Sequence, residues 1–180
     1  MRIAVIGWGS LIWDPRELPV QGGWRPNGPK LPVEFARFSG GDRLTLVLLP
    51  GVPLQPSLWT LSQSGSLQQA RRDLKEREEV ALNNIGVCAK EGAAGEGGLG
   101  SELIVPWLHE VDLDGAVWTT LSPNRPDKTA GMTTVAERMS WLRELVELGK
   151  ADAAKQYILR TPVQIATPFR SLVGQEMGWR

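Results

Sequence analysis

The charged run at residues 75–79 contains the carboxylate with the strongest case for chemistry. Before it, Leu67 and Leu74 lie at helical spacing and predict one apolar helix face. At about 100° per residue, Glu78 falls roughly 40° from Leu74 and roughly 20° from Leu67, on the same face. A carboxylate buried on such a face has a raised pKa because it is desolvated, which suits a general base.

The length of this helix decides between two interpretations of the charged run. Ser66 and Gln69 have the spacing of a capping box, which predicts where the helix begins. If the helix ends near Lys75, the run is a solvated cap without catalytic meaning. If the helix continues, Glu78 points toward the core, and Glu79 is the alternative for a register that differs by one residue.

A second candidate element follows a short apolar run near the amino-terminal end. The run Ile3–Ile6 is typical of a strand buried on both faces, and Gly7 and Gly9 then permit a bend or a close approach. Dinucleotide-binding domains also open with a strand and Gly-x-Gly. Their third small residue is Ile12 here, however, and Pro15 follows too early for a helix, so the pattern disfavours a nucleotide site.

The same loop carries a family resemblance. Gly7-Trp8-Gly9-Ser10-Leu11-Ile12-Trp13 resembles the Tyr-Gly-Ser-Leu signature, often continued as Ile-Trp, of ChaC-type and other γ-glutamylcyclotransferases. In that family the loop holds the γ-glutamyl group through backbone amides, and a glycine-bracketed loop can direct several N–H groups into one concavity. The signature tyrosine is Trp8 here, so its hydroxyl is missing. The resemblance implies substrate-binding roles for Gly7, Trp8, Gly9, Ser10, Leu11 and Trp13.

A second motif is similar to the same family. Leu74-Lys75-Glu76-Arg77-Glu78 resembles the Leu-Asp-x-x-Glu and Arg-Glu patterns that carry the family's catalytic glutamate, at a comparable distance after the loop. The resemblance implies that Glu78 is the catalytic base for cyclising a γ-glutamyl group to 5-oxoproline. The substrate's own α-amine is the nucleophile in that reaction, so no cofactor and no metal are expected. The implied fold is mixed α+β, a small, mostly antiparallel, barrel-like sheet with surrounding helices.

Composition limits the classes of partner. Twenty basic and twenty acidic residues balance, which gives no electrostatic case for nucleic acid or an anionic membrane. The first apolar run is too short for a signal peptide or a membrane span, so a cytoplasmic protein is expected. With 180 residues, 42% of them apolar, we expect one domain over 1–180, with a core at about 1–121 and a C-terminal helical elaboration at 132–180. The oligomeric state stays open.

Cysteine and histidine occur once each, as Cys88 and His109, which is too few for an internal disulfide or a zinc ligand cluster. Cys88 is expected to be a small buried residue of a strand rather than a reactive thiol. His109 could join Ser10 in a triad, although a polar residue at a strand end is the simpler interpretation. The eight tryptophans are scattered without a repeat, which predicts core or rim positions.

The remaining pattern predicts mostly sheet first and helices last. An irregular connection at 19–32 and a glycine-rich hairpin tip at 91–100 are expected. Strands are expected at 33–38, 43–49, 57–61, 85–90, 102–111 and 116–121. Helices are expected after the Thr134 and Glu137 capping pair and over 152–160, with a short turn after Thr167.

Three functions remain open from sequence alone. A γ-glutamylcyclotransferase-like enzyme could act on glutathione, another γ-glutamyl peptide or a γ-glutamyl amine. A non-catalytic ligand-binding or interaction domain on the same fold would bind an acidic small molecule at the loop, and Trp8 in place of the signature tyrosine permits it. An enzyme that releases a γ-linked amine by another route is the third possibility.

Overall fold

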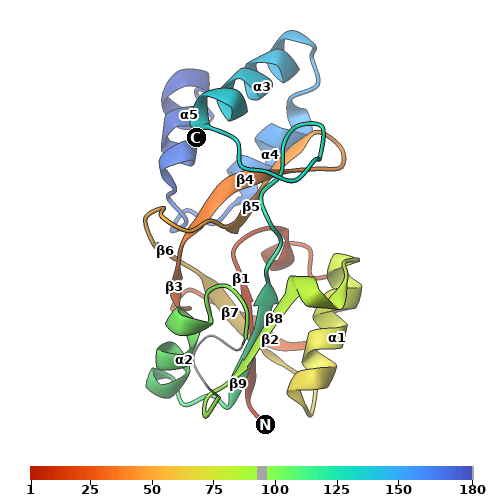
Figure 1. Cartoon of the computed structure of the whole chain (residues 1–180), viewed down its shortest axis with the longest axis vertical. Helices are drawn as coiled ribbons and strands as arrows, with labels where there is room; N and C mark the ends of the chain where they lie inside the picture. The colour runs from red at the N-terminus through yellow and green to blue at the C-terminus, as the bar shows by residue number, and fades with distance from the viewer. Residues whose placement is uncertain (93–96, 180) are drawn as a thin grey trace. The chain divides into compact units, whose positions relative to one another are not determined.

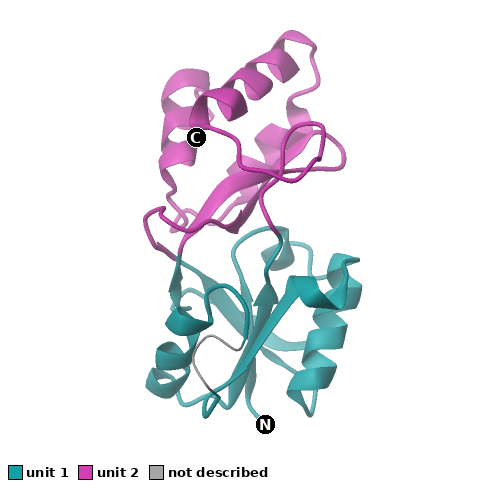
Figure 2. Cartoon of the chain, viewed as in Figure 1, with its two compact units in different colours: residues 1–31, 56–121 teal, residues 32–55, 122–180 magenta. Residues whose placement is uncertain are grey.

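The structure, a computed structural model, describes residues 1–92 and 97–179 (Figure 1). The chain divides into two compact units (Figure 2). The first unit comprises residues 1–31 and 56–121, and the second comprises residues 32–55 and 122–180. Helices and strands occur in both units, so the expected mixed α+β class is confirmed.

A five-stranded sheet forms the first unit, in the order β2-β7-β1-β9-β8. Its central strand, β1, pairs antiparallel with β7 and parallel with β9, and the other two pairings are antiparallel. The sheet is therefore mostly antiparallel, as expected. In the described part of the chain it is open, because edge strands β2 and β8 do not pair with each other, and the expected barrel is not closed. The strands are β1 (Ile3–Gly7), β2 (Val20–Arg25), β7 (Leu58–Ser62), β8 (Ile85–Ala89) and β9 (Gly115–Thr119).

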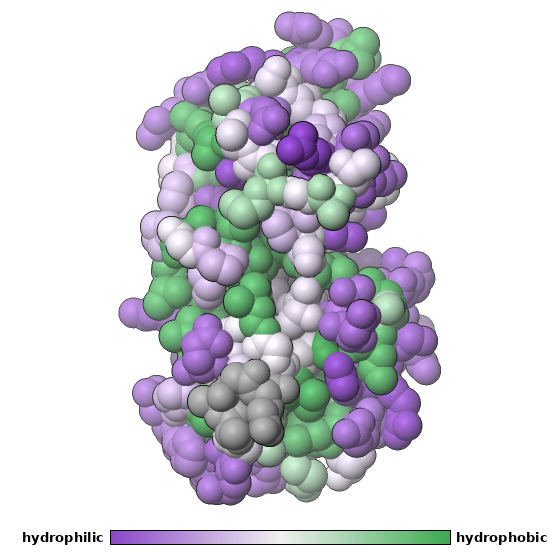
Figure 3. Space-filling model, viewed as in Figure 1, coloured by the Kyte–Doolittle hydropathy of each residue, from purple (hydrophilic) through white to green (hydrophobic). Residues whose placement is uncertain are grey.

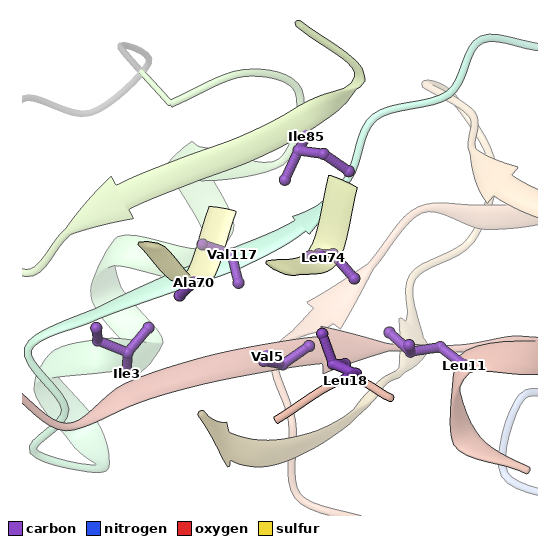
Figure 4. Close-up of a cluster of buried hydrophobic side chains, with 8 residues drawn as sticks. All are labelled: Ile3, Val5, Leu11, Leu18, Ala70, Leu74, Ile85 and Val117. Atoms are coloured by element: carbon purple, nitrogen blue, oxygen red, sulfur yellow. The ribbon is translucent and has the colours of Figure 1, made fainter. Parts of the chain in front are cut away.

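Both faces of the central strand are buried, as the apolar run predicts. Side chains alternate along a strand, so Ile3 and Val5 share one face and Ala4 and Ile6 the other. Helices α1 (Leu67–Glu78) and α2 (Ser101–Glu110) pack on opposite sides of the sheet (Figure 1). On the α1 side, the helix, the sheet and the loop after β1 contribute to a hydrophobic cluster of Ile3, Val5, Leu11, Leu18, Ala70, Leu74, Ile85 and Val117 (Figure 4).

Helix α2 corrects one sequence-based expectation. The apolar run 102–111 predicts a strand, but the chain is helical from Ser101 to Glu110. Buried Ile104 and Leu108 lie at helical spacing, while Pro106, which usually disfavours a helix interior, faces outward. A short apolar run does not distinguish a strand from a buried helix, and here the helix forms. Segment 91–100 thus joins a strand to a helix rather than two strands, and residues 93–96 of the predicted hairpin tip lie outside the described residues.

The segment 19–32 is a second correction, because it contains β2 and the short strand β3 (Lys30–Leu31). Strand β2 is a largely exposed edge strand with a register shift between Gln21 and Arg25. Gly22 lies within this shift at a φ of 81°, a conformation that glycine adopts without strain. The sequence did not predict this strand, because it is rich in glycine and polar residues. An exposed edge strand does not need a continuous apolar pattern.

The second unit is built on the predicted hairpin of β4 (Val33–Ser39) and β5 (Arg43–Leu48). Helices α4 (Asp152–Arg160) and α5 (Pro168–Met177) pack against these strands. Helix α3 (Val135–Glu147) begins with the complete predicted capping box of Thr134 and Glu137. The last helix is longer than the short turn expected after Thr167. The remaining elements of the chain are β6 (Gln55–Pro56) and, in the first unit, the 3₁₀ turns η1 (Ser10–Ile12) and η2 (Leu82–Asn84).

The visible surface mixes hydrophilic residues with smaller apolar patches (Figure 3). Among the residues that the structure describes, no helix has the length and apolar character to cross a membrane.

Candidate functional site

The loop after β1 forms a tight turn. The Ile12 N–H donates to the Gly9 carbonyl at 3.0 Å, and the Trp13 N–H donates to the Ser10 carbonyl at 3.2 Å. The first N–H groups of such a turn, including those of Ser10 and Leu11, have no acceptor within it. These amides lie in one short stretch of the chain. As expected, the turn does not start an α-helix.

Close packing fixes the start of this loop. A Cβ on Gly7 would lie 3.0 Å from the Trp24 ring and 3.3 Å from the Leu11 side chain, so a larger residue here would require these side chains to move. Trp8 and Leu11 are buried, and Trp13 is half-buried. The six residues predicted to bind substrate thus lie in one continuous, packed loop at the end of the central strand.

Helix α1 reaches the candidate base. The Ser66 hydroxyl accepts a hydrogen bond from the Gln69 N–H at 3.2 Å, and the helix continues to Glu78. Glu79 follows in a left-handed conformation, with φ of 56°, and ends the helix. The alternative in which the helix ends near Lys75 is therefore wrong. The Glu78 side chain is 17% exposed and that of Glu79 is 75% exposed, so Glu78 is the residue on the buried face.

One buried arginine dominates the surroundings of Glu78. Arg77 Nη1 lies 2.6 Å from Glu78 Oε1, and the Arg77 side chain is only 6% exposed. Burial raises the pKa of the Glu78 carboxyl, while the charge and hydrogen bond of Arg77 and the charge of Arg16 oppose the rise. A desolvated carboxylate with a raised pKa can both accept and return a proton.

Arg77 also connects the helix to the loop. Its Nε donates to the Asp14 carbonyl at 3.2 Å, and its Nη2 donates to the same oxygen. In the other direction, Arg16 Nη1 donates to the Arg77 carbonyl at 3.2 Å and to Glu79 Oε1 at 2.7 Å. The end of α1 and the chain after η1 are thus tied by two arginines, which sequence reasoning missed. The available signal was the position of Arg77 three residues after a core leucine.

Hydrophobic packing brings the two predicted motifs together. Leu11 from the loop and Leu74 from the helix belong to the same buried cluster (Figure 4). Because Leu74 lies one helical turn before Glu78, this packing and the Arg77 contact place the glutamate beside the chain that follows the Gly-Ser-Leu loop.

A hollow of about 370 Å³ lies beside this junction, and Glu78 is not part of its lining. Its walls are strongly charged and of both signs. They are Arg16, Glu17, Leu18, Pro19, Asp73, Glu76, Arg77 and Glu79.

The other candidate residues do not form a site. Burial raises the pKa of the Cys88 thiol to about 11, so this cysteine is a packed strand residue, as expected. His109 is exposed in the last turn of α2, and within residues 1–92 and 97–179 no hydrogen bond joins it to Ser10. Over the same residues, no cluster of three or more His, Cys, Asp or Glu side chains could hold a metal ion.

Comparisons of the chain with protein-family models, with curated proteins and with solved structures found no match.

Proposed function

We propose that this chain is a γ-glutamylcyclotransferase-like enzyme with the corresponding fold, which converts a γ-glutamyl group to 5-oxoproline. The observation that carries the proposal is the link from Glu78 through Arg77 to the Asp14 carbonyl, directly after the Gly-Ser-Leu loop. The two motifs that resemble the family are far apart in sequence and adjacent in the folded unit. This adjacency is what a two-part catalytic site requires.

The reaction needs little from the protein beyond positioning and proton transfer. The substrate's α-amine attacks its own γ-carbonyl carbon, a new C–N bond closes the five-membered ring, and the bond to the attached amine or peptide breaks. Well-oriented intramolecular attack can have an effective molarity of about 10⁵–10⁸ M. Holding the substrate in the folded pose therefore supplies much of the rate.

Glu78 carries the proton in this proposal. Its carboxylate takes a proton from the substrate's α-ammonium group, which frees the nucleophile, and returns it to the departing nitrogen. The partly buried position and raised pKa of Glu78 suit both steps, because the same group must accept and donate.

The loop stabilises the negative charge that develops on the substrate's carbonyl oxygen. Gly9, Ser10 and Leu11 contribute the backbone amides proposed to meet the carbonyl oxygen as the tetrahedral intermediate forms. Trp8 and Trp13, the aromatic residues of the loop, would lie beside the bound substrate. The attached amine or peptide could be that of glutathione, another γ-glutamyl peptide or a γ-glutamyl amine.

The test is 5-oxoproline formation, measured by mass spectrometry after incubation with glutathione, a γ-glutamyl dipeptide and a γ-glutamyl amine. The unmodified protein and Glu79→Gln should form the product from at least one compound. Glu78→Gln should lose about 10²- to 10⁴-fold in rate, the usual contribution of a general base. Glu79→Gln is the matched control because it changes the adjacent, exposed carboxylate.

Other results would contradict parts of the proposal. Full activity in Glu78→Gln, with loss in Glu79→Gln, would transfer the role to Glu79. No product from any compound, with binding still detected by calorimetry, would replace the enzyme by a non-catalytic binding domain.

A further inference from the structure

We propose that Arg77 is a positioning residue, whose guanidinium holds the Glu78 carboxylate in a fixed place relative to the loop after β1. The inference deepens the proposed function and rests on it for the chemical role of Glu78. The contacts themselves do not depend on that function.

Three donors of one planar group make the connection. Arg77 Nη1 donates to Glu78 Oε1 at 2.6 Å, while Nε and Nη2 both donate to the Asp14 carbonyl. The guanidinium plane fixes the angle between these donors, so the carboxylate and the carbonyl are held together. A lysine has one flexible ammonium group and cannot reproduce both contacts in the same geometry.

The Asp14 carbonyl is itself fixed to the loop. The Asp14 N–H donates to the Ser10 carbonyl at 2.8 Å, which closes the turn. An uninterrupted series of contacts therefore runs from Ser10 through Asp14 and Arg77 to Glu78. Because Arg77 is almost fully buried, its side chain has little freedom to leave this arrangement.

Arg77 also affects the ionisation of Glu78. Burial raises the pKa of Glu78 and Arg77 opposes that rise most strongly, so this arginine keeps more of the carboxylate ionised. The other cation that acts on Glu78 is Arg16, which is exposed and paired with Glu79 at 2.7 Å. Asp14 lies 3.8 Å from Arg16 and its carboxylate is exposed.

The same helix offers a matched control. Arg71 Nε donates to the Ile85 carbonyl at 2.8 Å, and its Nη2 donates to the Leu82 carbonyl at 3.0 Å. Arg71→Gln thus removes guanidinium bonds to backbone carbonyls of the same kind, without touching Glu78. Any general loss of stability should therefore occur in both arginine variants.

The kinetic test compares Arg77→Gln, Arg77→Lys and Arg71→Gln. We expect kcat for 5-oxoproline formation to fall about a hundredfold in both Arg77 variants, with a smaller change in KM. The acidic limb of the rate profile should move to higher pH in Arg77→Gln and less in Arg77→Lys, which keeps a positive charge. Arg71→Gln should leave kcat and the profile unchanged. Equal behaviour of Arg77→Gln and Arg71→Gln would overturn the proposal.

A second measurement needs neither activity nor an Arg77 variant that folds. In ¹⁵N-labelled unmodified protein, the Arg77 Nε–H should exchange slowly and its NMR signal should shift as Glu78 is protonated. In Glu78→Gln the pH-dependent shift should disappear. If the signal does not respond to pH in the unmodified protein, the guanidinium does not hold the carboxylate and the proposal fails, whatever the 5-oxoproline assay shows.

Discussion

The second unit contains a buried glutamate, Glu34, and the first unit contains a partly buried one, Glu78, and the partners of the two carboxylates differ. In the second unit, Glu34 Oε1 accepts the Phe35 N–H at 2.8 Å, and Oε2 accepts the Phe169 N–H at 3.2 Å. Phe169 lies in the first turn of α5, where backbone N–H groups lack partners within the helix. In the first unit, the hydrogen bond to Glu78 within the described residues comes from a side chain, Arg77.

The arginines of the two units, Arg77 and Arg138, also differ in their partners. Arg138 donates to the Phe35 carbonyl at 2.5 Å and to the Thr134 carbonyl at 3.3 Å, and it lies 4.9 Å from the centre of the Phe169 ring. The hydrogen bonds of Glu34 and Arg138 are therefore made to backbone groups, and they connect separate segments of the unit. Glu78 keeps 17% of its side chain exposed. Burial of a glutamate alone does not indicate catalysis, because a buried carboxylate can be fully engaged by backbone donors, as that of Glu34 is.

The largest effect expected in the second unit is on stability. Arg138→Met removes the two hydrogen bonds that the guanidinium donates to the Phe35 and Thr134 carbonyls. Loss of buried hydrogen bonds from a charged group costs about 1.5–3 kcal/mol, so the free energy of unfolding should fall by about that amount in urea denaturation.

The matched variant for this prediction is Arg143→Met on the same helix. Arg143 is exposed and pairs with Glu176, and exposed pairs are worth less than about 1 kcal/mol. If the two variants lose equal stability, the Arg138 contacts are not structural and the contrast with Arg77 is wrong.

A smaller effect is expected in the pH dependence of stability. Burial raises the pKa of Glu78 in the folded protein, so the folded state binds a proton more readily than the unfolded state. The contribution of this group to stability is therefore present at low pH and is lost as pH rises through the folded-state pKa.

Glu78→Gln lacks this dependence. The free energy of unfolding of the variant, minus that of the unmodified protein, should increase as the pH rises above the ordinary glutamate pKa of 4.5. Urea denaturation at several pH values measures it, with Glu79→Gln as the baseline. A difference that decreases over the same range would mean that the folded state favours the ionised carboxylate.

Local signals were enough to predict much of this fold. Ser66 and Thr134 cap their helices as their sequence spacing indicates, and the apolar run of β1 is a central strand. The position of Glu78 on the buried face followed from helical periodicity. These features depend on neighbouring residues in the chain, which sequence patterns describe well.

The missed features depend on tertiary contacts. Helix α2 contains Pro106 and a continuous apolar run, so its local pattern favours a strand and only packing decides for the helix. The role of Arg77 is not visible in the charged run 75–79, because its acceptor, the Asp14 carbonyl, is distant in sequence. Glu34 lies between apolar residues of β4, and its partner in α5 is not visible from that strand.

The measurement that most directly tests the central claim, that Glu78 is a desolvated and titratable carboxylate, is its titration by NMR. Protein labelled with ¹³C at the glutamate carboxyl carbons would be followed over pH, with Glu78→Gln to assign the signal. The structure predicts that Glu78 titrates above the ordinary value for glutamate, because burial disfavours its charged form. A midpoint at or below the ordinary value would contradict the account, since Glu78 would then be a structural partner of Arg77, as Glu34 is of its own backbone donors.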